Sequence, residues 1–174
     1  EMIVVIAIIA ILTGLVLGVN GLVQRKAASS RADAEMRMLI AAIKGYENDN
    51  GGVPQDATTT DSLDPRISSS PTSYLSASLY LYKKLSGDEN ANGKIDATGS
   101  APETARNYAP DYFRPSRLGG TKDANGKMTA VNSALDPFGN SWGYSTAGLK
   151  AEQEYRSKLA TASDPDSVKR TVAG

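Results

Sequence analysis

The chain has 174 residues, which is enough for one domain with an extension but not for two ordinary domains. Its 19 basic and 19 acidic side chains give a net charge of zero and form no long basic run, so the composition does not favour a nucleic-acid partner. The sequence has neither cysteine nor histidine, which excludes disulfides, thiolate nucleophiles and catalysis by an imidazole base.

The first segment is strongly apolar. Residues 2–19 carry no charge, and Thr13 is their one polar side chain. That length is close to the roughly 20 residues that span the apolar core of a bilayer. A cleaved signal peptide usually follows a basic segment, whereas here Arg25 and Lys26 come after the apolar run. An ordinary membrane anchor is the other simple interpretation, but it has no need of Glu1, because a carboxylate at the membrane-buried end of a helix is costly without a partner.

Residues 1–12, EMIVVIAIIAIL, resemble the N-terminal signature of type IV pilins and type II secretion pseudopilins. In that family a prepilin peptidase cleaves a few residues before a glutamate that Glu1 matches, so the resemblance implies that a few residues of the mature chain precede Glu1. It also implies that Glu1 neutralises the N-terminal amine of a neighbouring subunit during assembly. We therefore expect a homopolymer of identical subunits, which reside in the inner membrane before the assembly machinery acts on them.

Three glycines interrupt the apolar segment at Gly14, Gly18 and Gly21. Each costs a helix about 1 kcal/mol relative to alanine. One interpretation is that Gly14 and Gly18, four residues apart, form a close-packing face for a pair of membrane helices. The interpretation that we favour is local unwinding between Gly14 and Gly21 when the filament forms, because pilins often place a helix-breaking residue in this region.

The next segment changes character while keeping a helical pattern. Residues 25–47 carry five basic and three acidic side chains. The spacing of three and four residues predicts one apolar face that packs on the head, formed by Met36, Leu39, Ile40, Ile43 and Tyr46. Residues 48–52 supply the stop signal and Pro54 prevents continuation. The sequence thus divides into a hydrophobic stem (1–24), its amphipathic continuation (25–48) and a globular head (49–174).

The head shows patterns for a loop, two helices and a few strands. Residues 55–72 are rich in Ser, Thr and Pro and predict a loop, whereas 74–85 and 151–161 have helical spacing. Alternation between 109 and 146 predicts two to four short antiparallel strands, with a hairpin turn at 123–127.

A candidate calcium loop follows the first head helix. Oxygen-bearing side chains alternate at Asp88, Asn90 and Asn92, and are followed by Gly93, by the backbone carbonyl of Lys94 and by Asp96. This spacing matches the first nine positions of an EF-hand-type loop, because a hard cation needs several oxygens turned inward. Two of the ligands are neutral, and Gly99 stands where a bidentate glutamate would be. The alternative is a plain Asn-Gly turn.

Residues 135–144, LDPFGNSWGY, resemble the Asp-Pro-Trp-Gly-Asn-Pro-Tyr segment of major pseudopilins, with Phe138 in place of the tryptophan. Asp136 and the following proline initiate a turn, and we expect Phe138, Trp142 and Tyr144 to be core aromatics. We assign this segment a structural role.

Together these patterns predict an α+β, pilin-like fold in which a long N-terminal helix packs on a small antiparallel sheet. The predicted function is that of a structural subunit that polymerises into a type IV pilus-like filament on the cell surface. The alternative is the major pseudopilin of a type II secretion system, which forms a periplasmic pseudopilus. We expect no enzyme activity, because a membrane-anchored enzyme would need a pocket with paired carboxylates, and the sequence places none.

Overall fold

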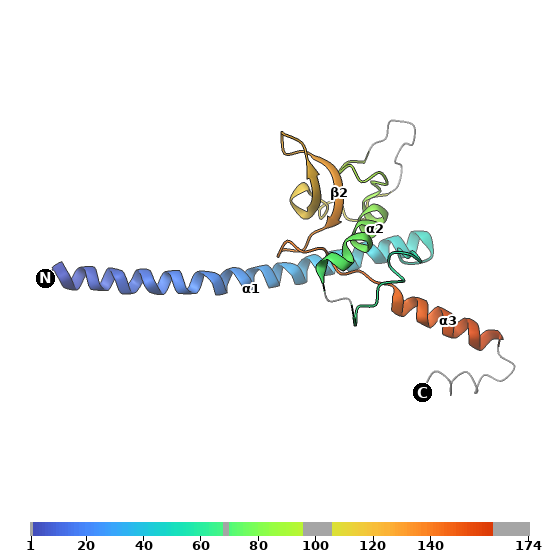
Figure 1. Ribbon diagram of the computed structural model, residues 1–174, viewed down its shortest axis with the longest axis horizontal. Coiled ribbons are helices and arrows are strands. Elements are labelled where there is room, and N and C mark those ends of the chain that lie inside the picture. The colour runs from blue at the N-terminus through green and yellow to red at the C-terminus, as the bar shows by residue number, and fades with distance from the viewer. Residues whose placement is uncertain (1, 68–69, 96–105, 162–174) are drawn as a thin grey trace.

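The computed structural model describes residues 2–67, 70–95 and 106–161, without the side chains of 2, 4 and 7–22. A long helix, further helices and a two-stranded antiparallel sheet make it an α+β protein (Figure 1). In chain order its elements are α1 (Met2–Asn50), η1 (Pro71–Tyr74), α2 (Leu75–Ser86), η2 (Pro115–Arg117), β1 (Leu118–Lys122), β2 (Met128–Ala134) and α3 (Ala147–Thr161).

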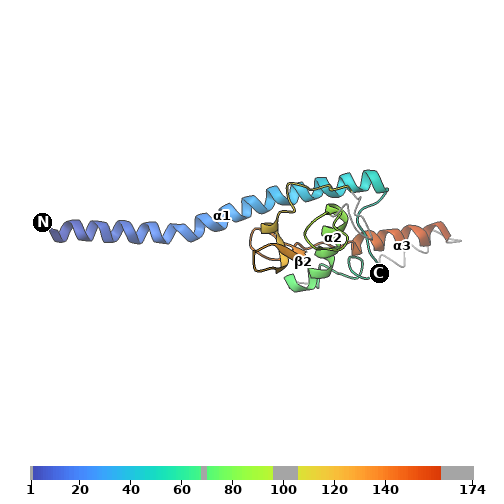
Figure 2. The same cartoon turned by 90° about the horizontal axis from the view of Figure 1, so that it is seen from above.

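Helix α1 dominates the shape of the molecule. Its 49 residues correspond to about 74 Å at 1.5 Å per residue, and its N-terminal half extends past the head (Figures 1 and 2). The helix ends where the sequence predicts, because Gly51 has a φ of 75° and its N–H donates to the carbonyl of Glu47 at 2.8 Å. In this single chain α1 continues without a break past Gly14, Gly18 and Gly21. Unwinding of that stretch concerns the filament, so it stays a prediction.

The face of α1 that packs on the head is not quite the predicted one. Leu39 and Ala42 are buried, together with Glu35, but Met36 is 46% exposed and Ile40 is 47% exposed. The predicted apolar face is therefore wrong at Met36 and Ile40, and it is confirmed at Leu39, Ile43 and Tyr46, which pack in or against the main core. The physical reason is the small side chain of Ala42, which lets α2 approach α1 closely on the neighbouring face.

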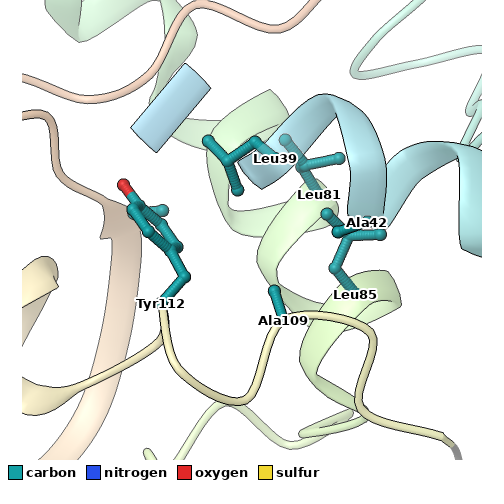
Figure 3. Close-up of a cluster of buried hydrophobic side chains, with 7 residues drawn as sticks. Leu39, Ala42, Leu81, Leu85, Ala109 and Tyr112 are labelled. Atoms are coloured by element: carbon teal, nitrogen blue, oxygen red, sulfur yellow. The ribbon is translucent and has the colours of Figure 1, made fainter. Parts of the chain in front are cut away.

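The main core lies where α1, α2 and the segment after residue 106 meet (Figure 3). Its buried residues are Leu39, Ala42, Leu81, Leu85, Ala109, Tyr112 and Ala134. Helix α2 ends at Gly87, which has a φ of 82° and donates its N–H to the carbonyl of Lys83. The predicted second helix and its glycine stop are thus confirmed.

Strands β1 and β2 form the antiparallel hairpin that the sequence predicts. The Asp123 carboxylate closes its turn by accepting the N–H groups of Asn125 and Lys127, both at 2.9 Å. A second buried cluster packs on the hairpin and consists of Tyr82, Ala91, Leu118, Met128 and Val131. In the described part of the chain, two strands occupy the region where two to four were predicted. Helix α3 confirms the predicted last helix and begins four residues earlier.

The turn that follows β2 corrects one prediction. The Asp136 carboxylate accepts the N–H groups of Phe138 and Asn140, both at 2.8 Å, and so holds a tight turn. Phe138 lies at the tip of this turn and is 55% exposed, so it is not a core aromatic. Trp142 and Tyr144 do pack against the main core.

Candidate functional site

The N-terminal part of α1 is the first region to which the sequence assigns a function. Glu1, the predicted assembly residue, lies outside the described residues, whereas Gly14, Gly18 and Gly21 lie in the helical backbone of α1. Of the side chains described near the start of α1, Ile3 is 81% exposed and Ile6 is 66% exposed. Among the residues whose side chains the structure describes, which leave out 7–22, no helix is apolar over a length sufficient to cross a membrane.

The next part of α1 carries exposed positive charges. Arg25, Lys26 and Arg31 are exposed, and no ion pair joins any of them to the described part of the chain. These three residues are called the basic segment below. Because the segment precedes the first buried position of α1 at Glu35, its side chains are available to another molecule.

Glu35 is an acidic residue on the buried face of α1. It is 8% exposed, and its Oε1 forms an ion pair with Arg117 of η2. Its Oε2 is buried and has no hydrogen-bond partner in the described structure. The pair borders a pocket of about 340 Å³ that is lined by Glu35, Met38, Asp111, Tyr112, Arg114, Ser116 and Arg117.

The sequence prediction missed this pair because its members are 82 residues apart in the chain. One signal was present, since Glu35 stands four residues before Leu39 and seven before Ala42, on the same helical face. An acid on an apolar face needs a partner, but the sequence does not say which cation supplies it.

The candidate calcium loop closes as a compact turn. Asp88 is fully buried, and its Oδ2 accepts the Tyr82 hydroxyl at 2.5 Å and the Gly93 N–H at 2.7 Å. Its Oδ1 accepts the Asn92 N–H at 3.1 Å. Positive φ angles at Ala91 (57°) and Gly93 (85°) bend the chain around this carboxylate.

The other predicted ligands of this loop are also engaged in the turn or lie outside it. The Asn90 side-chain oxygen accepts the Asn92 N–H, and the Asn92 oxygen accepts the Lys94 N–H. Asp96 lies outside the described residues. The described part of the chain contains no cluster of three acidic side chains that could hold a metal ion. The structure therefore brings four of the five predicted positions into one turn, and the calcium site stays a prediction.

One buried tyrosine, Tyr112, and one half-buried tyrosine, Tyr144, fix the segment 135–144 in the head. The Tyr112 hydroxyl donates to the carbonyl of Leu135 at 2.9 Å and accepts the indole N–H of Trp142. Burial raises the pKa of Tyr112 to about 12. Burial also raises the pKa of Tyr144, whose hydroxyl donates to the carbonyl of Pro54 at 2.6 Å. This arrangement supports the structural role assigned to the segment.

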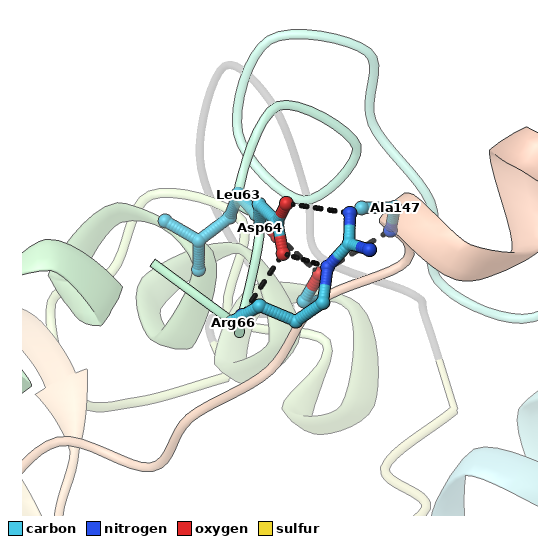
Figure 4. Close-up of polar contacts among 5 residues, drawn as sticks. Leu63, Asp64, Arg66 and Ala147 are labelled. Atoms are coloured by element: carbon cyan, nitrogen blue, oxygen red, sulfur yellow. Dashed lines mark hydrogen bonds and ion pairs between the residues drawn. The ribbon is translucent and has the colours of Figure 1, made fainter. Parts of the chain in front are cut away.

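The Thr- and Ser-rich loop is organised by side-chain hydrogen bonds of its own. The hydroxyls of Thr58 and Thr59 each donate to Asp56 Oδ1 at 2.8 Å, and these hydrogen bonds lower the pKa of Asp56 to about 2. Figure 4 shows the ion pair between Asp64 and Arg66, close to Leu63 and Ala147.

Hydrogen bonds of Ser145 and Thr146 join this loop to the start of α3. Ser145 donates to the carbonyl of Leu63 and accepts the N–H of Ala147. Thr146 completes the connection through its contacts with Thr60 and Asp61. The polar side chains of this region thus hold two segments of the chain together.

No family model, no curated protein and no solved structure matches this chain. Its own residues and their geometry are therefore what indicates its function.

Proposed function

We propose that this chain is a structural subunit that polymerises into a type IV pilus-like helical filament on the cell surface. The observation that carries the proposal is helix α1, which extends past the head and presents apolar side chains such as Ile3 and Ile6 to the outside. An apolar helix of this kind needs lipid or protein around it, because exposure costs about 0.8 kcal/mol per methylene. The inner membrane provides that environment before assembly, and the stems of identical copies provide it in a filament.

The resemblance of residues 1–12 to the pilin signature adds an assembly role for Glu1. A carboxylate among packed stems is stable only with a positive partner, and the N-terminal amine of a neighbouring copy supplies one. A prepilin peptidase and an assembly machinery are the partners that this role implies. Nothing in the charge distribution calls for nucleic acid.

Electron microscopy of the sheared extracellular fraction tests this proposal. Wild-type cells are expected to yield helical filaments of this chain, and Glu1→Ala is expected to leave the protein in the membrane without filaments. Glu47→Ala is the matched control, because Glu47 is an exposed acid of the same helix and has no ion pair in the described part of the chain. Normal filament yield from Glu1→Ala would refute the role of Glu1.

A second candidate function is that of the major pseudopilin of a type II secretion system, in a periplasmic pseudopilus. The segment 135–144 favours it through its resemblance to a segment of major pseudopilins, and Asp136 organises a turn there, although Phe138, which stands in place of the tryptophan, is exposed. Deletion of the chain separates the two functions. Loss of protein secretion would favour the pseudopilus, whereas loss of abundant surface filaments with normal secretion would favour the pilus.

Calcium binding at Asp88, Asn90, Asn92, Lys94 and Asp96 stays a prediction beside this function. Thermal unfolding with and without a calcium chelator tests it, with Asp88→Asn as the variant that should abolish any difference. Asp123→Asn in the hairpin turn is the control. An unchanged wild-type transition on chelation would count against calcium.

A further inference from the structure

The unpartnered oxygen of Glu35 is a polar group that the fold does not satisfy. Glu35 Oε1 is paired with Arg117, while Oε2 is buried without a donor in the described structure. A buried carboxylate oxygen without a hydrogen bond is costly, and native structures rarely retain one without a function. A donor from outside the chain would remove that cost.

The surroundings of Glu35 offer space for such a donor, and none of their own polar groups bonds to Oε2 in the described structure. The pocket beside it has a volume of about 340 Å³, which is far more than one water molecule requires. Its other cation, Arg114, lies 3.8 Å from the Asp111 carboxylate. The Tyr112 hydroxyl already donates to Leu135. The pocket is therefore suited to the end of one additional basic side chain.

The basic segment of α1 has the complementary property, because no ion pair joins its cations to an acid in the described part of the chain. Arg25 and Lys26 stand ten and nine residues before Glu35, which is about 15 Å and 14 Å along a helix. An unbroken helix keeps these two side chains away from the pocket of their own chain, whereas Arg31, one turn before Glu35, lies within reach of it in the same chain. A second copy of the chain, displaced along a parallel stem, can bring Arg25 or Lys26 into that pocket.

We propose that in the filament the basic side chain of Arg25 or Lys26 enters the Glu35 pocket of a neighbouring copy and donates to Glu35 Oε2. This contact rests on the proposed function, because it needs parallel stems of identical subunits. It requires an axial offset of about 14 to 15 Å between the two stems in contact. The head of one subunit would then fix the axial position of the neighbouring helix.

Neutral variants test the pairing. Glu35→Gln keeps the shape of the side chain, and Asp111→Asn is the matched control on an exposed acid of the same pocket. Filament yield per cell is expected to fall about tenfold or more with Glu35→Gln, since removing one partner of a buried charge pair is costly, and to change little with Asp111→Asn. Arg25→Gln or Lys26→Gln should give the same loss, and its combination with Glu35→Gln should be no worse than either single change. A loss from Arg31→Gln alone would indicate a contact within one chain and would overturn the proposal.

Cross-linking locates the contact independently of stability. The sequence contains no cysteine, so a disulfide can form only between introduced residues. Ser116→Cys at the pocket is combined with Arg25→Cys or Lys26→Cys in separate, differently tagged copies. At least one pair is expected to give covalent dimers in oxidised filaments, whereas Ser116→Cys with Lys158→Cys on α3 is expected to give none.

The outcomes separate this contact from the function on which it rests. A wild-type chain that never forms filaments overturns the proposed function. Filaments that form normally with Glu35→Gln, or that give no cross-link from either Arg25→Cys or Lys26→Cys, overturn the contact alone. If Glu35→Gln lowers the melting temperature of the monomer and both Arg25→Gln and Lys26→Gln leave filament yield unchanged, then Oε2 is simply hydrated and the contact is also overturned.

Discussion

Leu39→Ala tests how the head packs on the second half of α1. Leu39 is buried where α1 meets α2, and its neighbours in the main core include Leu81 and Leu85 (Figure 3). In the described part of α1 it is the largest apolar side chain that is buried. Truncating a buried leucine to alanine costs about 2–5 kcal/mol, from lost apolar transfer and from the cavity that remains. With a urea dependence of about 2 kcal/mol per molar, the unfolding midpoint should fall by about 1–2.5 M.

The chain supplies its own reporter for this measurement. Trp142 is the only tryptophan of the sequence and packs against the same core, so its fluorescence in urea follows the loss of this contact in the full-length chain in detergent. Ile40→Ala is the matched control, because Ile40 is adjacent in sequence but 47% exposed. It should change the free energy of unfolding by less than about 0.5 kcal/mol. Equal effects of the two variants, or a larger effect of Ile40→Ala, would refute the orientation of α1 described here.

Three further predictions concern the head. The pKa of Asp56 in the folded chain is lowered to about 2, so its contribution to stability is present above its ordinary pKa and is lost as the pH falls toward 2. An NMR titration of this carboxyl should find its midpoint near 2. A midpoint near 4 would contradict the threonine hydrogen bonds. Burial raises the pKa of Tyr112 to about 12, so its contribution is present below its ordinary pKa near 10 and is lost as the pH rises through 12. Ultraviolet absorbance should show late-ionising tyrosines, and Tyr112→Phe should remove one of them and leave that of Tyr144. A Cβ at Gly120 would lie 1.9 Å from the carbonyl oxygen of Ala130, so Gly120→Ala should disrupt the hairpin and lower the melting temperature strongly. Gly148→Ala in α3 is the control and should not lower the melting temperature, because a Cβ there meets nothing within 4 Å.

The elements of this fold were predictable because local patterns specify them. Glycine with positive φ ends both α1 and α2, at Gly51 and Gly87, and both stops can be read from the sequence. The hairpin was predictable for a similar reason, since the side chain of Asp123 and the glycine at 126 suit a tight turn.

The packing of these elements was not predictable to the same degree. Helical periodicity allows two overlapping faces of α1 that share Leu39, Ile43 and Tyr46, and hydrophobicity alone favours the one that adds Met36 and Ile40. The structure instead adds Glu35 and Ala42 to the shared positions, because Ala42 is small and because Arg117, 82 residues after Glu35, supplies a cation. A single sequence contains no signal that joins those two positions.

The candidate sites also differ in how far the sequence predicts them. The turn at Asp88 was predictable from the spacing of its oxygens, since local hydrogen bonds such as that of Gly93 N–H form it. The pocket at Glu35 was not, because it exists only where α1 meets the segment 111–117. A site built by one loop is visible in a sequence, whereas a site between distant elements requires the structure.

The choice of face on α1 has a consequence for the proposed filament. A chain selected only for the stability of its monomer would be expected to cover Met36 and Ile40 and to leave a glutamate in water, because burying apolar area is favourable and burying charge is costly. Helix α1 does the opposite, since it buries Glu35 and leaves Met36 and Ile40 exposed. If stems of neighbouring copies pack beside this helix, those exposed apolar side chains are the ones that they would cover, and Glu35 gains the donor that it lacks. The features of α1 that are unfavourable in one copy are therefore favourable in a polymer, and this is the strongest physical reason to test the chain as a filament subunit.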